Sequence, residues 1–157
     1  MKPLRVGVLS DTHGLLRAEA RQFLVGSDYI VHGGDIGGPD ILEALEAMAP
    51  LLVVRGNNDK GAWAAKIPAT ELVRIGEIFL YAIHDLNELD LDPVAAGVQV
   101  VVSGHSHQPK MERRGEVVYL NPGSCGPRRF KLPISVGELL ISGTDVRART
   151  VELPGGK

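Results

Sequence analysis

The chain has little cysteine, no long hydrophobic run and no marked excess of charge of either sign. Its single cysteine, Cys125, rules out an internal disulfide, so a reducing compartment fits and we expect a cytoplasmic protein. No stretch approaches the roughly 18 consecutive apolar residues of a membrane span. Ser10 and Asp11 interrupt the first apolar run too early for a signal peptide.

The charge balance argues against a polyanionic partner. The 157 residues include 17 Lys and Arg against 19 Asp and Glu, a formal net charge of −2. A protein that follows a phosphate backbone or an acidic membrane surface carries a basic excess. We therefore expect no membrane partner and disfavour a nucleic-acid partner. The composition is that of an ordinary globular protein, and the length suits one domain over residues 1–157.

The first half of the chain alternates strand-like and helix-like patterns. Short apolar, β-branched runs predict strands at 5–10, 28–32 and 51–55. Apolar residues at helical spacing predict helices at 15–25 and 40–48. Because the joins are short, this order predicts a parallel α/β unit with right-handed crossovers.

The second half is mostly strand-like. A helix is expected at 86–97, although its first part is disfavoured because Asp92 precedes a proline. The expected strands lie at 70–76, 77–83, 98–103, 116–121, 133–142 and 145–153. Together the two halves predict an α/β protein with two packed sheets flanked by helices.

Polar residues with metal-binding or catalytic chemistry gather directly after five of the expected strands. The carboxyl ends of strands in open α/β sheets are where ligands bind. In chain order these residues are Asp11 and His13, then Asp35, then Asn57 with Asn58 and Asp59, then His84 with Asp85, and last His105 with His107.

An isolated His-x-His pair such as His105 and His107 is equally consistent with an ordinary polar turn. Its setting favours metal binding, because four of the five histidines stand at strand ends beside oxygen donors. Nitrogen and oxygen ligands without thiolate suit Mn, Fe, Ni, Co or Zn. The set is too large for one open zinc site. It is large enough for two ions that share a carboxylate, the usual arrangement for phosphoryl transfer.

The ordered motifs "DTH", "GGD", "GNND", a strand-end histidine and "GHSH" resemble those of the calcineurin-like metallophosphoesterases. The chain length and "NPGS" at 121–124 resemble the small bacterial and archaeal phosphodiesterases of that superfamily, which are similar in fold to vacuolar protein sorting 29. The resemblance runs from residue 5 to about residue 152. It implies a four-layer α/β/β/α sandwich of two mixed sheets flanked by helices.

The resemblance also implies residue roles. Metal site one would take Asp11, His13 and His107, site two would take Asn57, His84 and His105, and Asp35 would bridge them. Asp35, Asn57, His84 and His107 are the implied catalytic residues. Two divalent ions are expected, with manganese first and nickel, cobalt, iron or zinc as alternatives. A hydroxide bridging the ions would attack a small phosphate ester in line, most readily a phosphodiester.

The chain departs from the family pattern at two positions. Larger phosphatases have a histidine, thought to be the general acid, where this chain has Asn58. We therefore expect aryl and other activated esters to react best. Small relatives often have His-Gly-His at the fourth motif, whereas here Asp85 follows His84. Asp59 or Asp85 could substitute as the general acid, but for each of them a role in orienting neighbouring groups is favoured.

Four further residues have less specific expectations. Asn58 and Arg128 are candidate substrate contacts, and Arg128 with Arg129 could equally form a solvated basic turn. His32 and Cys125 are expected to be structural. For Trp63, core packing is favoured over a role in capping the site or in an oligomer interface.

Two other functional classes stay open. The first is a non-catalytic scaffold on the same fold, which would have no need of the seven ligands. The second is a nuclease, which the charge balance disfavours. Relatives often self-associate, so a homo-oligomer is possible.

Overall fold

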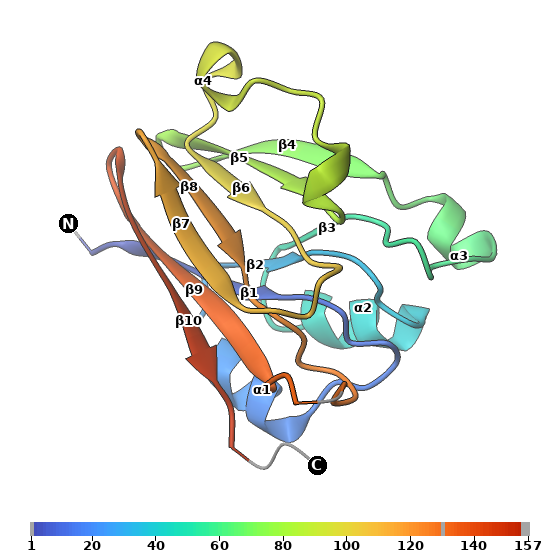
Figure 1. The fold of residues 1–157 in the computed structure, drawn as a ribbon. Coiled ribbons are helices and arrows are strands. Elements are labelled where there is room, and N and C mark those ends of the chain that lie inside the picture. The colour runs from blue at the N-terminus through green and yellow to red at the C-terminus, as the bar shows by residue number, and fades with distance from the viewer. Residues whose placement is uncertain (1, 130, 155–157) are drawn as a thin grey trace.

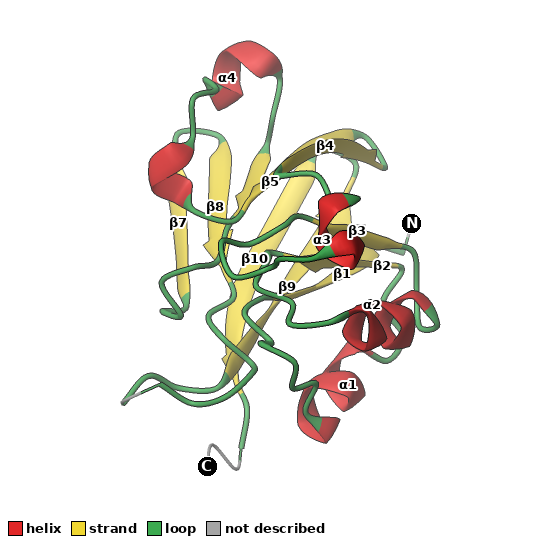
Figure 2. Cartoon of the chain, turned by 90° about the vertical axis from the view of Figure 1, so that its right-hand side faces the viewer, coloured by secondary structure: helices red, strands yellow, loops and turns green. Residues whose placement is uncertain are grey.

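The computed structural model describes residues 2–129 and 131–154, which form two sheets and a few short helices (Figures 1 and 2). In chain order the elements are β1 (Leu4–Leu9), α1 (Ala18–Leu24), β2 (Tyr29–His32), α2 (Pro39–Glu46), β3 (Leu51–Val53), α3 (Ala62–Ala65), β4 (Thr70–Ile75), β5 (Ile78–Ile83), the 3₁₀ turn η1 (Leu86–Glu88), α4 (Pro93–Ala96), β6 (Val100–Val102), β7 (Lys110–Arg114), β8 (Val117–Asn121), β9 (Ser135–Ser142) and β10 (Asp145–Glu152). One sheet has the order β10-β9-β1-β2-β3 and the other β4-β5-β6-β8-β7.

The first sheet is mixed, as expected. β1, β2 and β3 are parallel because α1 and α2 supply the crossovers, and β9 and β10 continue the sheet in antiparallel pairing. Successive side chains alternate between its two faces. Val6 and Val8 face the second sheet, whereas Leu9 and Ile30 face the two helices.

The second sheet is also mixed and lies against the first. Its inner face contributes Leu80, Val100 and Leu120 to the core between the sheets, all buried. Its outer face carries a smaller cluster around Val101 and Tyr119. Among the described residues, η1 contributes Leu86 to that cluster, whereas the short helix α4 lies at the top of Figure 1, so the fourth layer is thin and leaves part of the sheet open.

Three local expectations need correction. The helix expected at 86–97 is replaced by η1 and the four-residue α4. The first segment ends at Glu88, and Asp92 begins the second, because its side chain accepts hydrogen bonds from the amides of Val94 and Ala95. The helix expected at 15–25 begins only at Ala18. Strand β7 and helix α3 were not predicted at all.

The architecture brings the expected ligands to one edge. β1, β2, β3, β5 and β6 all run toward the same region, and the loops that follow them carry the polar motifs. The site therefore lies where the carboxyl-terminal ends of strands from the two sheets meet. Within the described residues, no helix is long and apolar enough to cross a bilayer.

Candidate metal centre

The loops after β1 and β2 are fastened to each other by backbone hydrogen bonds. The amide of Asp11 donates to the carbonyl of Gly34 at 2.9 Å, and the amide of His13 donates to the carbonyl of Asp35 at 2.9 Å. These bonds fix three candidate ligands relative to one another before any ion binds.

The backbone of the site is held in an uncommon conformation. Across the described ranges, the non-glycine residues with positive φ are Asp11, His13, Asp35, His105 and His107, with values from 45° to 71°. All five are among the seven predicted ligands. Left-handed non-glycine residues are uncommon and tend to cluster at functional sites. The sequence motifs gave no sign of this feature.

The carboxylate of Asp11 is anchored by one oxygen only. Its Oδ2 accepts hydrogen bonds from the Ser10 hydroxyl at 2.6 Å and from the His105 amide at 3.1 Å. Its Oδ1 is buried and, among the described residues, has no hydrogen-bond partner. Gly104 lies so close that a Cβ there would contact both the Ser10 hydroxyl and Asp11 Oδ2, so glycine is needed at this position.

The free oxygen of Asp11 faces three imidazole nitrogens. Asp11 Oδ1 lies 3.3 Å from Nε2 of His107, 3.8 Å from Nε2 of His13 and 4.0 Å from Nε2 of His84. A buried carboxylate oxygen surrounded by nitrogen lone pairs is costly unless a cation or a proton joins them.

Asp35 lies between the two predicted halves of the site. Its Oδ2 is 3.7 Å from Nε2 of His13 and 3.3 Å from Nε2 of His84. Burial alone would raise the pKa of Asp35, but the neighbouring His84 imidazole and the hydrogen bonds from Asn58 lower that pKa well below its ordinary value. Asp35 is therefore a carboxylate that reaches toward both groups of imidazoles.

The ring of His84 is oriented by the backbone. Its Nδ1 lies 2.7 Å from the Gly33 carbonyl, which can only accept, so Nδ1 carries a proton and Nε2 points at the carboxylates. Burial opposes the charged ring, but Asp35, the Gly33 carbonyl and Asp11 outweigh it and raise the pKa of His84. Within the described residues its buried Nε2 has no hydrogen-bond partner.

Asn57 and His105 form the outer part of the cluster. Oδ1 of Asn57 lies 3.2 Å from Nδ1 of His105, and the rings of His84 and His105 are 5.2 Å apart between centroids. The side chain of His105 is 44% exposed, so this side of the centre opens to solvent.

The donor set fits divalent metal ions. One group joins Asp11, His13 and His107, and a second joins Asp11, Asp35 and His84, with the ligand atoms of each group within 4.8 Å of one another. The orphaned Oδ1 of Asp11 and Nε2 of His84 are the atoms that a cation would satisfy. Asp11 belongs to both groups, so it can approach a second ion as Asp35 can.

The motif residues Asn58, Asp59 and Asp85 occupy different environments. Asn58 donates its amide to Oδ1 of Asp35 at 2.9 Å and its Nδ2 to Oδ2 at 3.0 Å. Asp59 is buried and accepts hydrogen bonds from the amides of Ile36, Gly37 and Gly56, so it orients the loops as expected. Asp85 accepts from the Asn87 amide, and its Oδ2 lies 3.8 Å from Nε2 of His105.

The expectations for His32, Cys125 and Trp63 are confirmed. His32 is fully buried beside the centre, where its Nδ1 accepts from the Gly34 amide and its ring contacts Thr12. Burial lowers the pKa of His32 to about 4 and raises the pKa of the Cys125 thiol to about 12. Trp63 packs against the core beneath the first sheet.

Arg128 and Asn121 lie on either side of Cys125. Arg128 is exposed, and its role in substrate binding stays a prediction. Asn121 was quoted only as part of "NPGS", yet its Nδ2 donates to the Gly104 carbonyl at 2.9 Å and to the Ser106 hydroxyl at 3.0 Å. It thereby supports the turn that carries His105 and His107. Asn121 could have been identified from the sequence because, like the other motif residues, it stands at the end of an apolar run.

Comparison with known proteins agrees with this geometry. The model of the calcineurin-like phosphoesterase superfamily domain matches residues 4–143. A probable metallophosphoesterase of Methanothermobacter thermautotrophicus is 34% identical over 93% of this chain and 91% of its own length. Phosphodiesterase YfcE of Escherichia coli K12 is 30% identical over 83% of this chain and 84% of its own length. The solved structure of vacuolar protein sorting 29 from Cryptosporidium parvum has a TM-score of 0.78 at 17% identity, covering 97% of this chain and 98% of that one.

Fold and site together define a metal-dependent hydrolase of phosphate esters. The chain belongs to the calcineurin-like phosphoesterase superfamily. The expected fold of two mixed sheets flanked by helices is confirmed, as is the likeness to vacuolar protein sorting 29.

Proposed function

We propose that this protein is a phosphodiesterase that holds two divalent metal ions in the cluster around Asp11 and Asp35. The observation that carries the proposal is the buried Oδ1 of Asp11, which no described residue satisfies and which faces Nε2 of His107, His13 and His84. Its relative YfcE is named a phosphodiesterase, which favours a diester over a monoester as substrate.

The first group, Asp11, His13 and His107, would hold one ion. As the family resemblance implies, we assign Asn57, His84 and His105 to the other ion, with Asp35 between the two. When bound, the ions would supply Lewis-acid charge and an activated water for in-line attack on phosphorus. Manganese is the proposed ion, although nitrogen and oxygen ligands without thiolate suit iron, nickel, cobalt and zinc as well. The lone, buried Cys125 favours a cytoplasmic location. In that compartment, manganese and the alternative ions would compete for the site through their availability as well as their affinity.

The chain's own side chains do the positioning. Asn58 holds both oxygens of Asp35, and Ser10 with the His105 amide holds one oxygen of Asp11. Both carboxylates are thus aimed before substrate arrives, which is the preorganisation that electrostatic catalysis needs. Since Asn58 is an amide, it cannot protonate a leaving group. Substrates that depart as stable anions are therefore the ones this site handles best.

The test is metal-dependent hydrolysis of bis(p-nitrophenyl) phosphate and p-nitrophenyl phosphate by metal-stripped protein. Mn, Ni, Co, Zn or Mg is added back, with Asp35→Asn and His107→Ala alongside and the exposed Asp145→Asn as control. We expect activity to return with a transition metal, to favour the diester, and to fall by at least about 100-fold in both site variants. A folded protein that binds two ions and hydrolyses neither ester with any metal would contradict the proposal and favour a scaffold role.

A further inference from the structure

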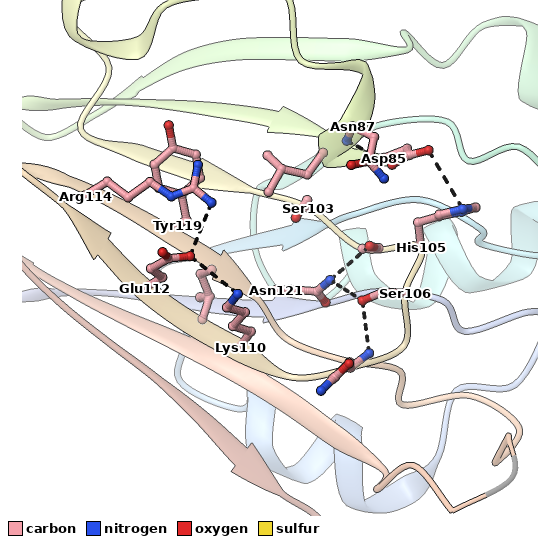
Figure 3. Close-up of a pocket in the computed structure, with 14 residues that line it drawn as sticks. Asp85, Asn87, Ser103, His105, Ser106, Lys110, Glu112, Arg114, Tyr119 and Asn121 are labelled. Atoms are coloured by element: carbon pink, nitrogen blue, oxygen red, sulfur yellow. Dashed lines mark hydrogen bonds and ion pairs between the residues drawn. The ribbon is translucent and has the colours of Figure 1, made fainter.

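A pocket of about 500 Å³ begins at His105 and extends over the outer face of the second sheet (Figure 3). Its volume lies within the roughly 300–1,000 Å³ of small-molecule sites. The pocket is open because η1 and α4 cover only part of this face. None of the roles assigned above uses its far end.

The strand register explains which side chains line the pocket. β8 pairs with β7 so that Tyr119 stands opposite Glu112 and Asn121 opposite Lys110. Alternation along the strands places all four side chains, with Arg114, on the outer face. Ser103, directly after β6, lies at the end nearest the metal centre.

The two ends of the pocket differ in chemistry. At the metal end, the side chain of Asn121 is hydrogen-bonded to the Gly104 carbonyl and to Ser106, so its position in the pocket wall is fixed. At the far end, the guanidinium of Arg114 lies over the ring of Tyr119, 4.4 Å from its centroid. Glu112 pairs with Arg114 at 3.3 Å and with Lys110 at 3.6 Å, which holds the guanidinium in place. Figure 3 shows this stack and the two paired groups on the side of the pocket away from His105.

The two ends of the pocket are separated by a short distance along β8. Tyr119 lies two residues before Asn121 on β8, about 7 Å along the strand. The metal centre lies beyond Asn121, on the side of His105, so a ligand with its phosphorus there would reach the Arg114–Tyr119 stack only through a spacer of at least this length, such as a sugar. A guanidinium held flat over an aromatic ring is a surface on which planar heteroaromatic groups stack.

We propose that this pocket binds the nucleoside part of a nucleotide phosphodiester, with the base stacked on the Arg114–Tyr119 pair and the phosphate at the metal centre. The proposal rests on the proposed phosphodiesterase function and names its substrate class. Arg114 and Tyr119 are specificity-determining residues, because they contact the non-leaving group and leave the reacting atoms to the metal centre.

The experiment compares two substrates that release the same p-nitrophenol. One is the p-nitrophenyl ester of thymidine 5′-monophosphate, and the other is methyl p-nitrophenyl phosphate, which lacks the nucleoside. We expect kcat/KM for the thymidine ester to exceed that for the methyl ester by about tenfold or more, mainly through KM. In Arg114→Gln and Tyr119→Leu the preference should fall toward unity, with hydrolysis of the methyl ester unchanged.

Arg147→Gln is the matched control. Arg147 is also an exposed arginine on an edge strand, paired with an acidic residue two positions earlier, but it lies on β10 of the other sheet. It should keep the wild-type preference. Equal kcat/KM for the two esters, or a preference that both pocket variants retain, would overturn the proposal.

Direct binding separates this proposal from the phosphodiesterase function. Calorimetric titration of the metal-loaded protein with thymidine 5′-monophosphate, against methyl phosphate, should show tighter binding of the nucleotide that is lost in Arg114→Gln and Tyr119→Leu. If the protein hydrolyses neither ester, the proposed function fails, and this titration still decides whether the pocket holds a nucleoside. Equal binding of the two phosphates would reject the pocket assignment even in an active enzyme.

Discussion

Asp59 should be the residue whose loss most disturbs the metal centre without removing a ligand. Its side chain is 5% exposed and accepts hydrogen bonds from the amides of Ile36, Gly37 and Gly56. These amides belong to the loops that carry Asp35 and Asn57. The carboxylate therefore joins two ligand-bearing loops, which are otherwise linked by the hydrogen bonds from Asn58 to Asp35.

The effect of Asp59→Ala can be worked from those three bonds. Each buried amide left without an acceptor costs about 1–3 kcal/mol. We expect the free energy of unfolding to fall by about 3–5 kcal/mol, because water that enters the vacated space would accept hydrogen bonds from some of the three amides. Asp59→Asn keeps one oxygen but turns an NH₂ group toward one of the amide donors, so it should cost about 1–3 kcal/mol.

The assay is urea unfolding of the metal-free protein, followed by calorimetric titration with Mn²⁺. Both variants should also bind the ion more weakly, because mutations of groups that orient ligands typically cost about 10–100-fold in metal affinity. The substitution Asp145→Ala, at the exposed first residue of β10, should leave both quantities unchanged. If the free energy of unfolding of Asp59→Ala stays within about 1 kcal/mol of wild type and the variant binds Mn²⁺ with wild-type affinity, other contacts hold the loops and the reasoning is refuted.

Three further predictions concern separate features. Gly104→Ala places a Cβ against Ser10 and Asp11 Oδ2, so Mn²⁺ affinity measured by calorimetry should fall by about tenfold or more; an unchanged affinity would mean that the turn adapts freely. Burial raises the pKa of Cys125 to about 12, so an aromatic disulfide reagent at pH 8 should label it in urea and leave it unlabelled in the native protein; rapid native labelling would contradict its buried position. Because Asn58 cannot donate a proton, rates for a series of aryl methyl phosphates should fall steeply as the pKa of the leaving phenol rises, and Asn58→His should flatten the slope; a flat wild-type slope would reveal another general acid.

The sequence predicted the elements whose local pattern and tertiary environment agree. Buried β-branched runs became β1, β2 and β6, and the polar residues after them came together because parallel strands end at one edge. β7 escaped prediction because its residues "KMERR" are polar; it is an edge strand held by pairing with β8. The expected helix at 86–97 failed at Asp92, where capping of a new turn outweighed continuation.

The sequence could predict the set of candidate ligands but not the geometry of the site. Motif spacing named all seven, because each follows a strand, yet no pattern in the sequence showed that Asp11 Oδ2 is anchored and Oδ1 is left free. That asymmetry arises from contacts between residues far apart in the chain, such as the His105 amide, which lies 94 positions after Asp11. Local periodicity carries no information about such contacts.

The backbone conformation of the candidate ligands favours a metal-binding centre over a purely structural role. In the described part of the chain the non-glycine residues with positive φ are the candidate ligands Asp11, His13, Asp35, His105 and His107. Left-handed conformations at non-glycine residues cost about 1 kcal/mol or more each, so the five together cost at least about 5 kcal/mol. That is comparable with the net stability of many whole domains. A scaffold without metal would lose nothing if these residues became glycine or relaxed to ordinary φ. Here they are retained as carboxylates and imidazoles that converge on one point, so the strain is explained by ion binding and left unexplained by a purely structural role.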